Sequence, residues 1–155
     1  DYRLDKAKEL GATHVINYKN QDLEQSIKEI NNGEYPDVTI EAAGHAEAFN
    51  TALKIVKPLG QILIFGKLLK DEQGTLATIE TEHLLHHGAT IINSSGVNSG
   101  NPTSHIERMV ELKKRGWWDP STMITHNMNF SDIQKAYDMY ENQDDNIIKV
   151  VLNQD

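Results

Sequence analysis

The chain of 155 residues contains no cysteine, so disulfides and thiolate metal sites are excluded. Basic residues are scarce as well: the net charge is −8, and no basic run is longer than Lys113–Arg115. This balance argues against nucleic acid as a partner, because nucleic-acid binding depends on clustered positive charge. The apolar runs are far shorter than the ~20 residues of a membrane-spanning helix, which argues against a membrane partner. With no visible signal peptide, we expect a cytoplasmic protein.

The sequence also lacks an initial methionine. Its first residues, Asp1 to Ala12, already have the pattern of a helix that Gly11 ends. Because natural proteins rarely start in the middle of such an element, we expect the chain to be a piece of a longer protein.

The most informative segment runs from Asp37 to Gly66. It opens with apolar strand formers that end in small residues and Gly44, continues with a helix-like stretch at 46–56, breaks at Pro58–Gly60, and ends in a second apolar run. Two short strands joined by a helix predict a parallel pair, since a parallel crossover needs a dozen or more residues. Ligands of open parallel sheets lie at the carboxyl ends of the strands, where glycine permits close approach to the backbone.

Helical and strand patterns alternate along the rest of the chain, which predicts an α/β fold. The length predicts a single domain, 1–155. We expect helices at 4–10, 22–30, 81–87, 104–114 (capped by Ser104) and after Ser131, and strands at 14–17, 89–93 and 147–152.

These landmarks, in this order, resemble the medium-chain dehydrogenase/reductase superfamily, in particular the zinc-type alcohol and polyol dehydrogenases. The likeness rests on an ordered set with the correct spacing and covers nearly the whole chain. The matching residues are Arg3-Leu4, Ala7 through Ala12, Val15–Asn17, Asp37-Val38, Glu41, Gly44, Ala52-Leu53, Leu59-Gly60, Phe65-Gly66, Ile124–His126 and Ile148–Val151.

The resemblance implies a Rossmann-like, mostly parallel sheet flanked by helices, of which this chain is the later part with the family's closing segment. The first two strands, the glycine-rich turn and the acidic residue that grips the adenosine ribose would all precede Asp1. No G-x-G-x-x-G motif occurs within the 155 residues. The choice between NAD and NADP therefore cannot be read from this sequence.

The resemblance further implies that the parent protein uses NAD or NADP to oxidise a small alcohol or polyol to a carbonyl compound. Zinc in the parent would be held by a preceding catalytic domain, so that this chain contributes no metal ligand and no catalytic residue and is inactive alone. The family also forms homo-oligomers through the strand at 89–93. The alternatives are a zinc-free quinone reductase of the same superfamily, a methyl-donor-binding α/β domain, and a non-catalytic folding or dimerisation module.

The cofactor contacts implied by the resemblance fall on three turns and two cations. They are Ala42, Ala43 and Gly44 for the adenosine side or the bridging phosphates, Phe65, Gly66 and Lys67 for the nicotinamide ribose, Ser94, Ser95 and Gly96 for the carboxamide, Lys149 for the pyrophosphate, and Arg3 for the adenosine ribose. A lysine beside a diphosphate gains charge-assisted hydrogen bonds.

Other polar and aromatic residues are interpreted as structural. His83, His86 and His87 have a spacing that can chelate zinc, but no cysteine accompanies them and the family has no metal there, so we interpret them as surface residues. We expect His126 to be structural, Glu41 to be a hydrogen-bonding anchor at the end of its strand, and Trp117-Trp118 to pack as a cap on the preceding helix.

Overall fold

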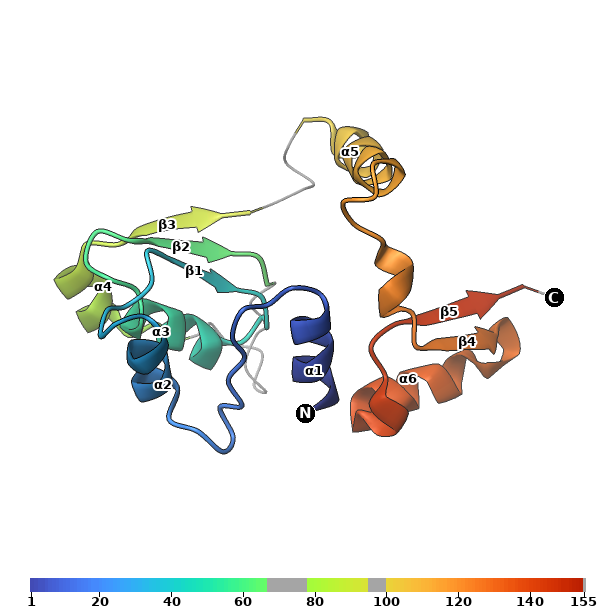
Figure 1. Ribbon diagram of the computed structural model, residues 1–155, viewed down its shortest axis with the longest axis horizontal. Helices are drawn as coiled ribbons and strands as arrows, with labels where there is room; N and C mark the ends of the chain where they lie inside the picture. The colour runs from blue at the N-terminus through green and yellow to red at the C-terminus, as the bar shows by residue number, and fades with distance from the viewer. Residues whose placement is uncertain (67–77, 95–99, 155) are drawn as a thin grey trace. The chain divides into compact units, whose positions relative to one another are not determined.

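The computed structural model describes residues 1–66, 78–94 and 100–154. The chain divides into two compact units, which can be followed by colour in Figure 1. Unit 1 consists of Asp1–Val15 and Asn101–Asp155, and unit 2 of Ile16–Gly100. The expectation of one domain over 1–155 stays a prediction.

Unit 2 is built on a parallel sheet of three strands in the order β1-β2-β3, which confirms the predicted α/β class. Ile40, Leu63 and Ile92 are aligned across the three strands. Figure 1 shows α3 and α4 on one face of this sheet. The elements are α2 (Leu23–Ile30), β1 (Val38–Glu41), α3 (Ala46–Lys54), β2 (Gln61–Ile64), α4 (Thr81–His87) and β3 (Thr90–Asn93).

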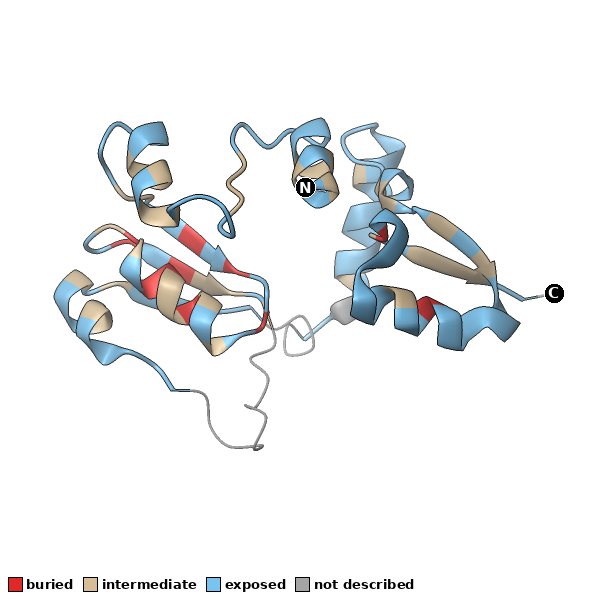
Figure 2. Ribbon diagram, turned by 90° about the horizontal axis from the view of Figure 1, so that it is seen from below, coloured by how far each residue is buried: buried red, intermediate tan, exposed pale blue. Residues whose placement is uncertain are grey.

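The core of unit 2 lies between α3 and the sheet. Phe49, Leu53 and Val56 repeat at helical spacing and are at most 1% exposed, and Ile62 of β2 is fully buried against them. Figure 2 shows these buried positions gathered on α3 and the strands that it covers. Burying side chains of this size stabilises the fold by about 1.5–3 kcal/mol each. Ile40 lies on the opposite face of the sheet and is 62% exposed.

Unit 1 contains a second parallel pair, in which Met128 of β4 is aligned with Leu152 of β5. Ala136 and Ile147 are its buried apolar residues. Its elements are α1 (Tyr2–Glu9), α5 (Pro102–Lys114), the 3₁₀ turns η1 (Pro120–Met123), η2 (Phe130–Asp132) and η3 (Asp144–Asn146), β4 (His126–Asn129), α6 (Ile133–Asn142) and β5 (Val150–Asn153).

The strand expected at 14–17 does not form, and the final strand begins at Val150 rather than at Ile147. A β-strand requires a neighbouring strand with which its backbone forms hydrogen bonds. Residues 14–17 have no such neighbour within the described part of the chain. The Asn17 N–H instead donates to the side chain of Gln21 at 2.9 Å. Strand β4 was missed because its sequence, His-Asn-Met-Asn, has little β propensity.

Two helix caps and one aromatic cap also differ from expectation. Asn101, not Ser104, caps α5: its side chain accepts from the Ser104 N–H at 3.3 Å, and the Ser104 hydroxyl donates to the Asn101 carbonyl at 2.8 Å. Ser131 lies inside η2, so that Asp132 is the residue before α6. Trp117 is 78% exposed and therefore does not pack as a cap on α5. Among the described residues, no helix has both the length and the apolar character needed to cross a membrane.

Candidate functional site

The turns that follow β1 and β2 touch each other at the carboxyl edge of the sheet. The N–H groups of Phe65 and Gly66 both donate to the Glu41 carbonyl, at 2.8 and 2.9 Å. A Cβ on Gly66 would lie 2.5 Å from the Gly44 nitrogen and 2.5 Å from Glu41 Oε2. Gly44 itself has φ +79°, a conformation that favours glycine. These two turns are therefore in direct contact, and position 66 has no room for a side chain.

Glu41 is the buried acid at this junction, only 2% exposed. Its Oε1 accepts hydrogen bonds from the N–H groups of Ala43 and Gly44, at 2.7 and 2.6 Å. Its Oε2 is buried and has no hydrogen-bond partner among the residues that the structure describes. The prediction that Glu41 is a hydrogen-bonding anchor at the end of its strand is confirmed.

The predicted contact residues of unit 2 lie at this same edge where they are described. Ala42, Ala43 and Phe65 are exposed, Phe65 at 68%, whereas Gly44 is buried. The Ser94 N–H donates to the Ile64 carbonyl at 2.9 Å, which continues the ladder between β2 and β3 past the end of β3. The predicted contacts Lys67, Ser95 and Gly96 lie outside the described residues.

Arg3, in unit 1, lies beside the backbone that leads into Lys149. Its Nη2 donates to the Ile147 carbonyl at 3.4 Å, and the Tyr2 hydroxyl donates to the same carbonyl at 2.9 Å. Arg3 also lines a shallow cleft of about 500 Å³ with Lys6 and Ile148 among its other residues. The structure thus brings the two predicted cations of unit 1 to one segment of the chain.

Two residues that were not among the predicted cofactor contacts, Thr125 and Tyr140, hold this segment. Thr125 Oγ1 accepts from the N–H groups of Ile148 and Lys149, at 3.0 and 3.3 Å. The Tyr140 hydroxyl donates to the Ile148 carbonyl at 3.0 Å and accepts from the Val150 N–H at 3.3 Å. Side-chain bonds on both sides of Lys149 fix its backbone while its side chain stays exposed.

Two of the seven histidines have structural contacts. His126 Nδ1 lies 2.9 Å from Thr125 Oγ1, and its Nε2 lies 3.2 Å from Asp145 Oδ2, which supports the structural role expected for it. His87 Nδ1 lies 3.1 Å from the Leu53 carbonyl. Within the described ranges, no group of three or more His, Cys, Asp or Glu side chains could hold a metal ion.

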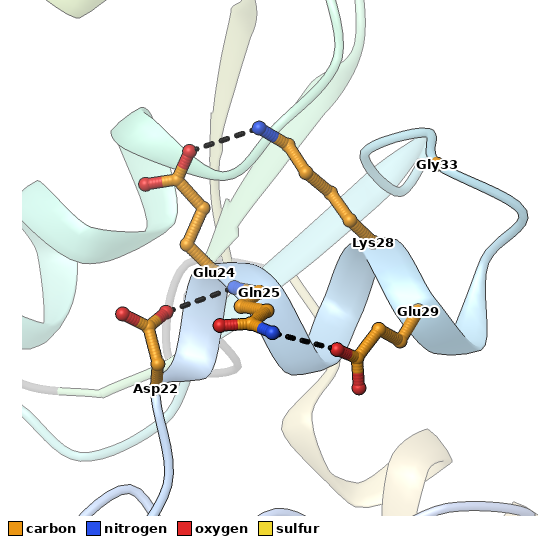
Figure 3. A pocket seen from close by; sticks show the side chains of 6 residues that line it. All are labelled: Asp22, Glu24, Gln25, Lys28, Glu29 and Gly33. Atoms are coloured by element: carbon orange, nitrogen blue, oxygen red, sulfur yellow. Dashed lines mark hydrogen bonds and ion pairs between the residues drawn. The ribbon is translucent and has the colours of Figure 1, made fainter.

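A second cleft, of about 470 Å³, lies along α2 and is drawn in Figure 3. Glu24 accepts hydrogen bonds there from the Tyr35 hydroxyl and, at 3.1 Å, from Lys28, and forms an ion pair with Lys54 of α3 at 2.9 Å. The hydrogen bond from Tyr35, followed by those from the two lysines, lowers the pKa of Glu24 to about 2. Because the acidic side chains of this cleft hydrogen-bond within the protein, we interpret the cleft as a structural network.

Glu24→Gln is expected to reduce the loss of stability in acid. The Glu24 pKa lies below its ordinary value of 4.5, so its stabilising contribution is complete above about pH 4.5 and disappears as the pH falls towards about 2. Urea unfolding midpoints at pH 7, 4 and 3 should therefore fall less steeply for Glu24→Gln than for the wild type. Glu29→Gln is the matched control, since Glu29 on the same helix accepts from the neutral amide of Gln25. Parallel pH profiles of Glu24→Gln and the wild type would contradict the assignment.

Comparison with known proteins identifies the family. Residues 1–114 match the family described as zinc-binding dehydrogenase. The chain belongs to the zinc-binding dehydrogenase family. This confirms the predicted superfamily.

Two curated relatives of this zinc-binding dehydrogenase chain are alcohol dehydrogenases. It is 32% identical over 150 residues to the NADP-dependent isopropanol dehydrogenase of Thermoanaerobacter brockii, covering 96% of this chain and 42% of the relative. It is 27% identical over 152 residues to an alcohol dehydrogenase of Cupriavidus necator, covering 98% of this chain and 40% of the relative. The chain thus spans about two fifths of the length of these relatives.

Solved structures of dehydrogenases have the same fold. Benzyl alcohol dehydrogenase from Acinetobacter calcoaceticus is 29% identical, with a TM-score of 0.81 over 99% of this chain and 40% of that one. A short chain alcohol dehydrogenase from E. coli CFT073, complexed with the cofactor NADH, is 25% identical with a TM-score of 0.80, over 99% of this chain and 42% of that one.

Proposed function

We propose that this chain forms one wall of the nicotinamide cofactor site of an NAD(P)-dependent dehydrogenase that oxidises a small alcohol. The observation that carries the proposal is the contact between the turns at Gly44 and Gly66, where a Cβ would collide with the neighbouring turn. Such glycine turns at the carboxyl ends of parallel strands are where open α/β sheets receive a nucleotide. The NADP-dependent relative and the NADH-bound structure named above support a nicotinamide cofactor.

The chain's own residues would bind and orient the cofactor, which supplies the hydride chemistry when bound. The turns after β1 and β2 offer closely spaced backbone to a nucleoside, and Ser94, at the same edge of the sheet, would contact the carboxamide. Separately, in unit 1, we propose Lys149 and Arg3 as cations for the pyrophosphate and the adenosine ribose. Homo-oligomerisation through 89–93 stays a prediction, which light scattering across a concentration series would test.

Zinc, which the family name implies, finds no ligand set in the part of the chain that the structure describes. The chain alone is expected to reduce no NAD or NADP in the presence of zinc and small alcohols.

Nucleotide binding by the isolated chain is expected to be weak. The 155 residues hold no G-x-G-x-x-G turn to cradle the pyrophosphate, so the dissociation constant for NAD or NADP should be on the order of millimolar or weaker, equivalent to about −4 kcal/mol. Lys149→Met should weaken binding several-fold, because one exposed charge pair contributes up to ~1 kcal/mol. Lys135→Met, which removes another exposed lysine, from α6, should not. NMR titrations with both nucleotides measure this, and equal losses in the two variants would contradict the role of Lys149.

A further inference from the structure

Lys149 belongs to a short stretch of backbone whose polar groups are bound by side chains. It directly precedes the first aligned pair of β4 and β5, His126 with Val150. The Thr125 side chain accepts from the N–H groups of Ile148 and Lys149, at 3.0 and 3.3 Å. The Thr125 backbone N–H in turn donates to the Lys149 carbonyl at 2.9 Å. One threonine therefore holds the peptide groups on both sides of the Lys149 side chain.

Tyr140 holds the same stretch from α6. Its hydroxyl donates to the Ile148 carbonyl at 3.0 Å and accepts from the Val150 N–H at 3.3 Å. These two partners are the residues immediately before and after Lys149 in the sequence. The tyrosine thus bridges the lysine position, and together with Thr125 it leaves the backbone there little freedom to rotate.

The Thr125 hydroxyl is itself held by an imidazole and a carboxylate. His126 Nδ1 lies 2.9 Å from Thr125 Oγ1, and His126 Nε2 lies 3.2 Å from Asp145 Oδ2. Supporting contacts of this kind keep a side chain in one rotamer, which is what a precisely placed binding group requires. The position of the Thr125 hydroxyl against Lys149 is therefore fixed as well.

These side-chain bonds are not needed to satisfy the backbone. Thr125, Tyr140 and Lys149 are all exposed, so water could bond to the same N–H and carbonyl groups. Ordering side chains costs conformational entropy, whereas bonding to water does not order them. What the side-chain bonds provide beyond those of water is a constant direction for the side chain of Lys149.

We propose that Thr125 and Tyr140 are positioning residues for the anion contact of Lys149, because they fix the backbone from which its ammonium group reaches a diphosphate. This inference rests on the proposed function, in which Lys149 contacts the pyrophosphate of the cofactor. A lysine is a flexible point charge, so a fixed backbone reduces the freedom that it loses on meeting a phosphate. Removing either hydroxyl therefore weakens binding only while the lysine is present.

A double-mutant cycle in the ¹⁵N-labelled chain tests this, with dissociation constants for NAD and for inorganic pyrophosphate measured by NMR titration. Thr125→Val and Tyr140→Phe should each weaken binding by about two- to threefold, less than Lys149→Met does. In the Lys149→Met background, neither should weaken binding further. Thr125→Ser keeps the hydroxyl and should retain wild-type affinity. Tyr137→Phe is the matched control, since it removes an exposed hydroxyl from the same helix.

Equal losses for Thr125→Val with and without Lys149, or wild-type affinity in both hydroxyl variants while Lys149→Met weakens binding, would overturn the proposal and leave the proposed function standing. A purely structural role would lower the stability of unit 1, which contains both tryptophans and is followed by their fluorescence, without any dependence on Lys149. Should Thr125→Val fail to fold, Tyr140→Phe completes the cycle.

The two probes separate this proposal from the proposed function. If the cycle holds for pyrophosphate while NAD produces no saturable shift, the positioning of Lys149 stands and the proposed cofactor site fails. If Lys149→Met changes the affinity for neither probe, the positioning proposal is wrong, because there is then no anion contact to position.

Discussion

Replacing Phe49 by alanine is expected to destabilise unit 2 by about 3–5 kcal/mol. Phe49 is 1% exposed and belongs to the buried cluster with Leu53, Val56 and Ile62. Removing its ring reduces the buried apolar surface and leaves a cavity between α3 and the sheet. A close-packed core cannot fill this cavity completely. Amide hydrogen exchange of β1 and β2 under native conditions measures the loss in unit 2 itself.

Leu85→Ala provides the control for this experiment. Leu85 lies on α4 of the same unit but is 78% exposed, so its truncation should change stability by no more than about 0.5 kcal/mol. Trp117 and Trp118 both belong to unit 1, so their fluorescence separately reports whether that unit is affected. Similar losses for Phe49→Ala and Leu85→Ala would contradict the assigned core.

Gly66→Ala is expected to cost about 1–3 kcal/mol through overpacking and to weaken nucleotide binding about tenfold. The new Cβ would lie 2.5 Å from Glu41 Oε2 and 2.5 Å from the backbone nitrogen of Gly44. The backbone cannot give way as the end of a flexible side chain would, so the two turns must separate. Thermal unfolding and an NMR titration with NAD measure the two effects.

Gly33→Ala separates this steric effect from ordinary backbone strain. Gly33 has φ +87° and open space around its Cα, so alanine there carries the strain without a collision. It should lower stability but leave nucleotide binding unchanged. Wild-type affinity in Gly66→Ala would contradict the role of the packed turns in binding.

The strand–helix–strand unit and α4 could be predicted because their signals are local. The apolar spacing of α3 and the breaking residues around Gly60 define the crossover, and Gly88, at φ +54°, ends α4 at the predicted residue. The strand at 14–17 could not be judged locally, since pairing depends on a partner elsewhere in the chain. Strand β4 is polar and owes its pairing to β5, which its own sequence does not reveal.

The site was predictable in its placement but not in its detail. Parallel strands bring their carboxyl ends to one edge, so the turns at Gly44 and Gly66 could be expected to meet there. Glu41 could be predicted as a hydrogen-bonding anchor, but its acceptance of two N–H groups on one oxygen depends on a side-chain rotamer, which no pattern encodes. The contact of Arg3 with Ile147 joins residues 144 positions apart, and no local signal in the sequence predicts it.

The most direct test of the proposed cofactor site is an NMR titration of the ¹⁵N-labelled chain with NAD and NADP up to concentrations above the expected millimolar range. We expect one or both nucleotides to produce saturable shifts at Gly44, Gly66 and Lys149, with the cleft along α2 unaffected. Shifts confined to the α2 cleft, between Asp22 and Gly33, or no saturable shift with either nucleotide, would contradict a cofactor site at the carboxyl edge of the sheet.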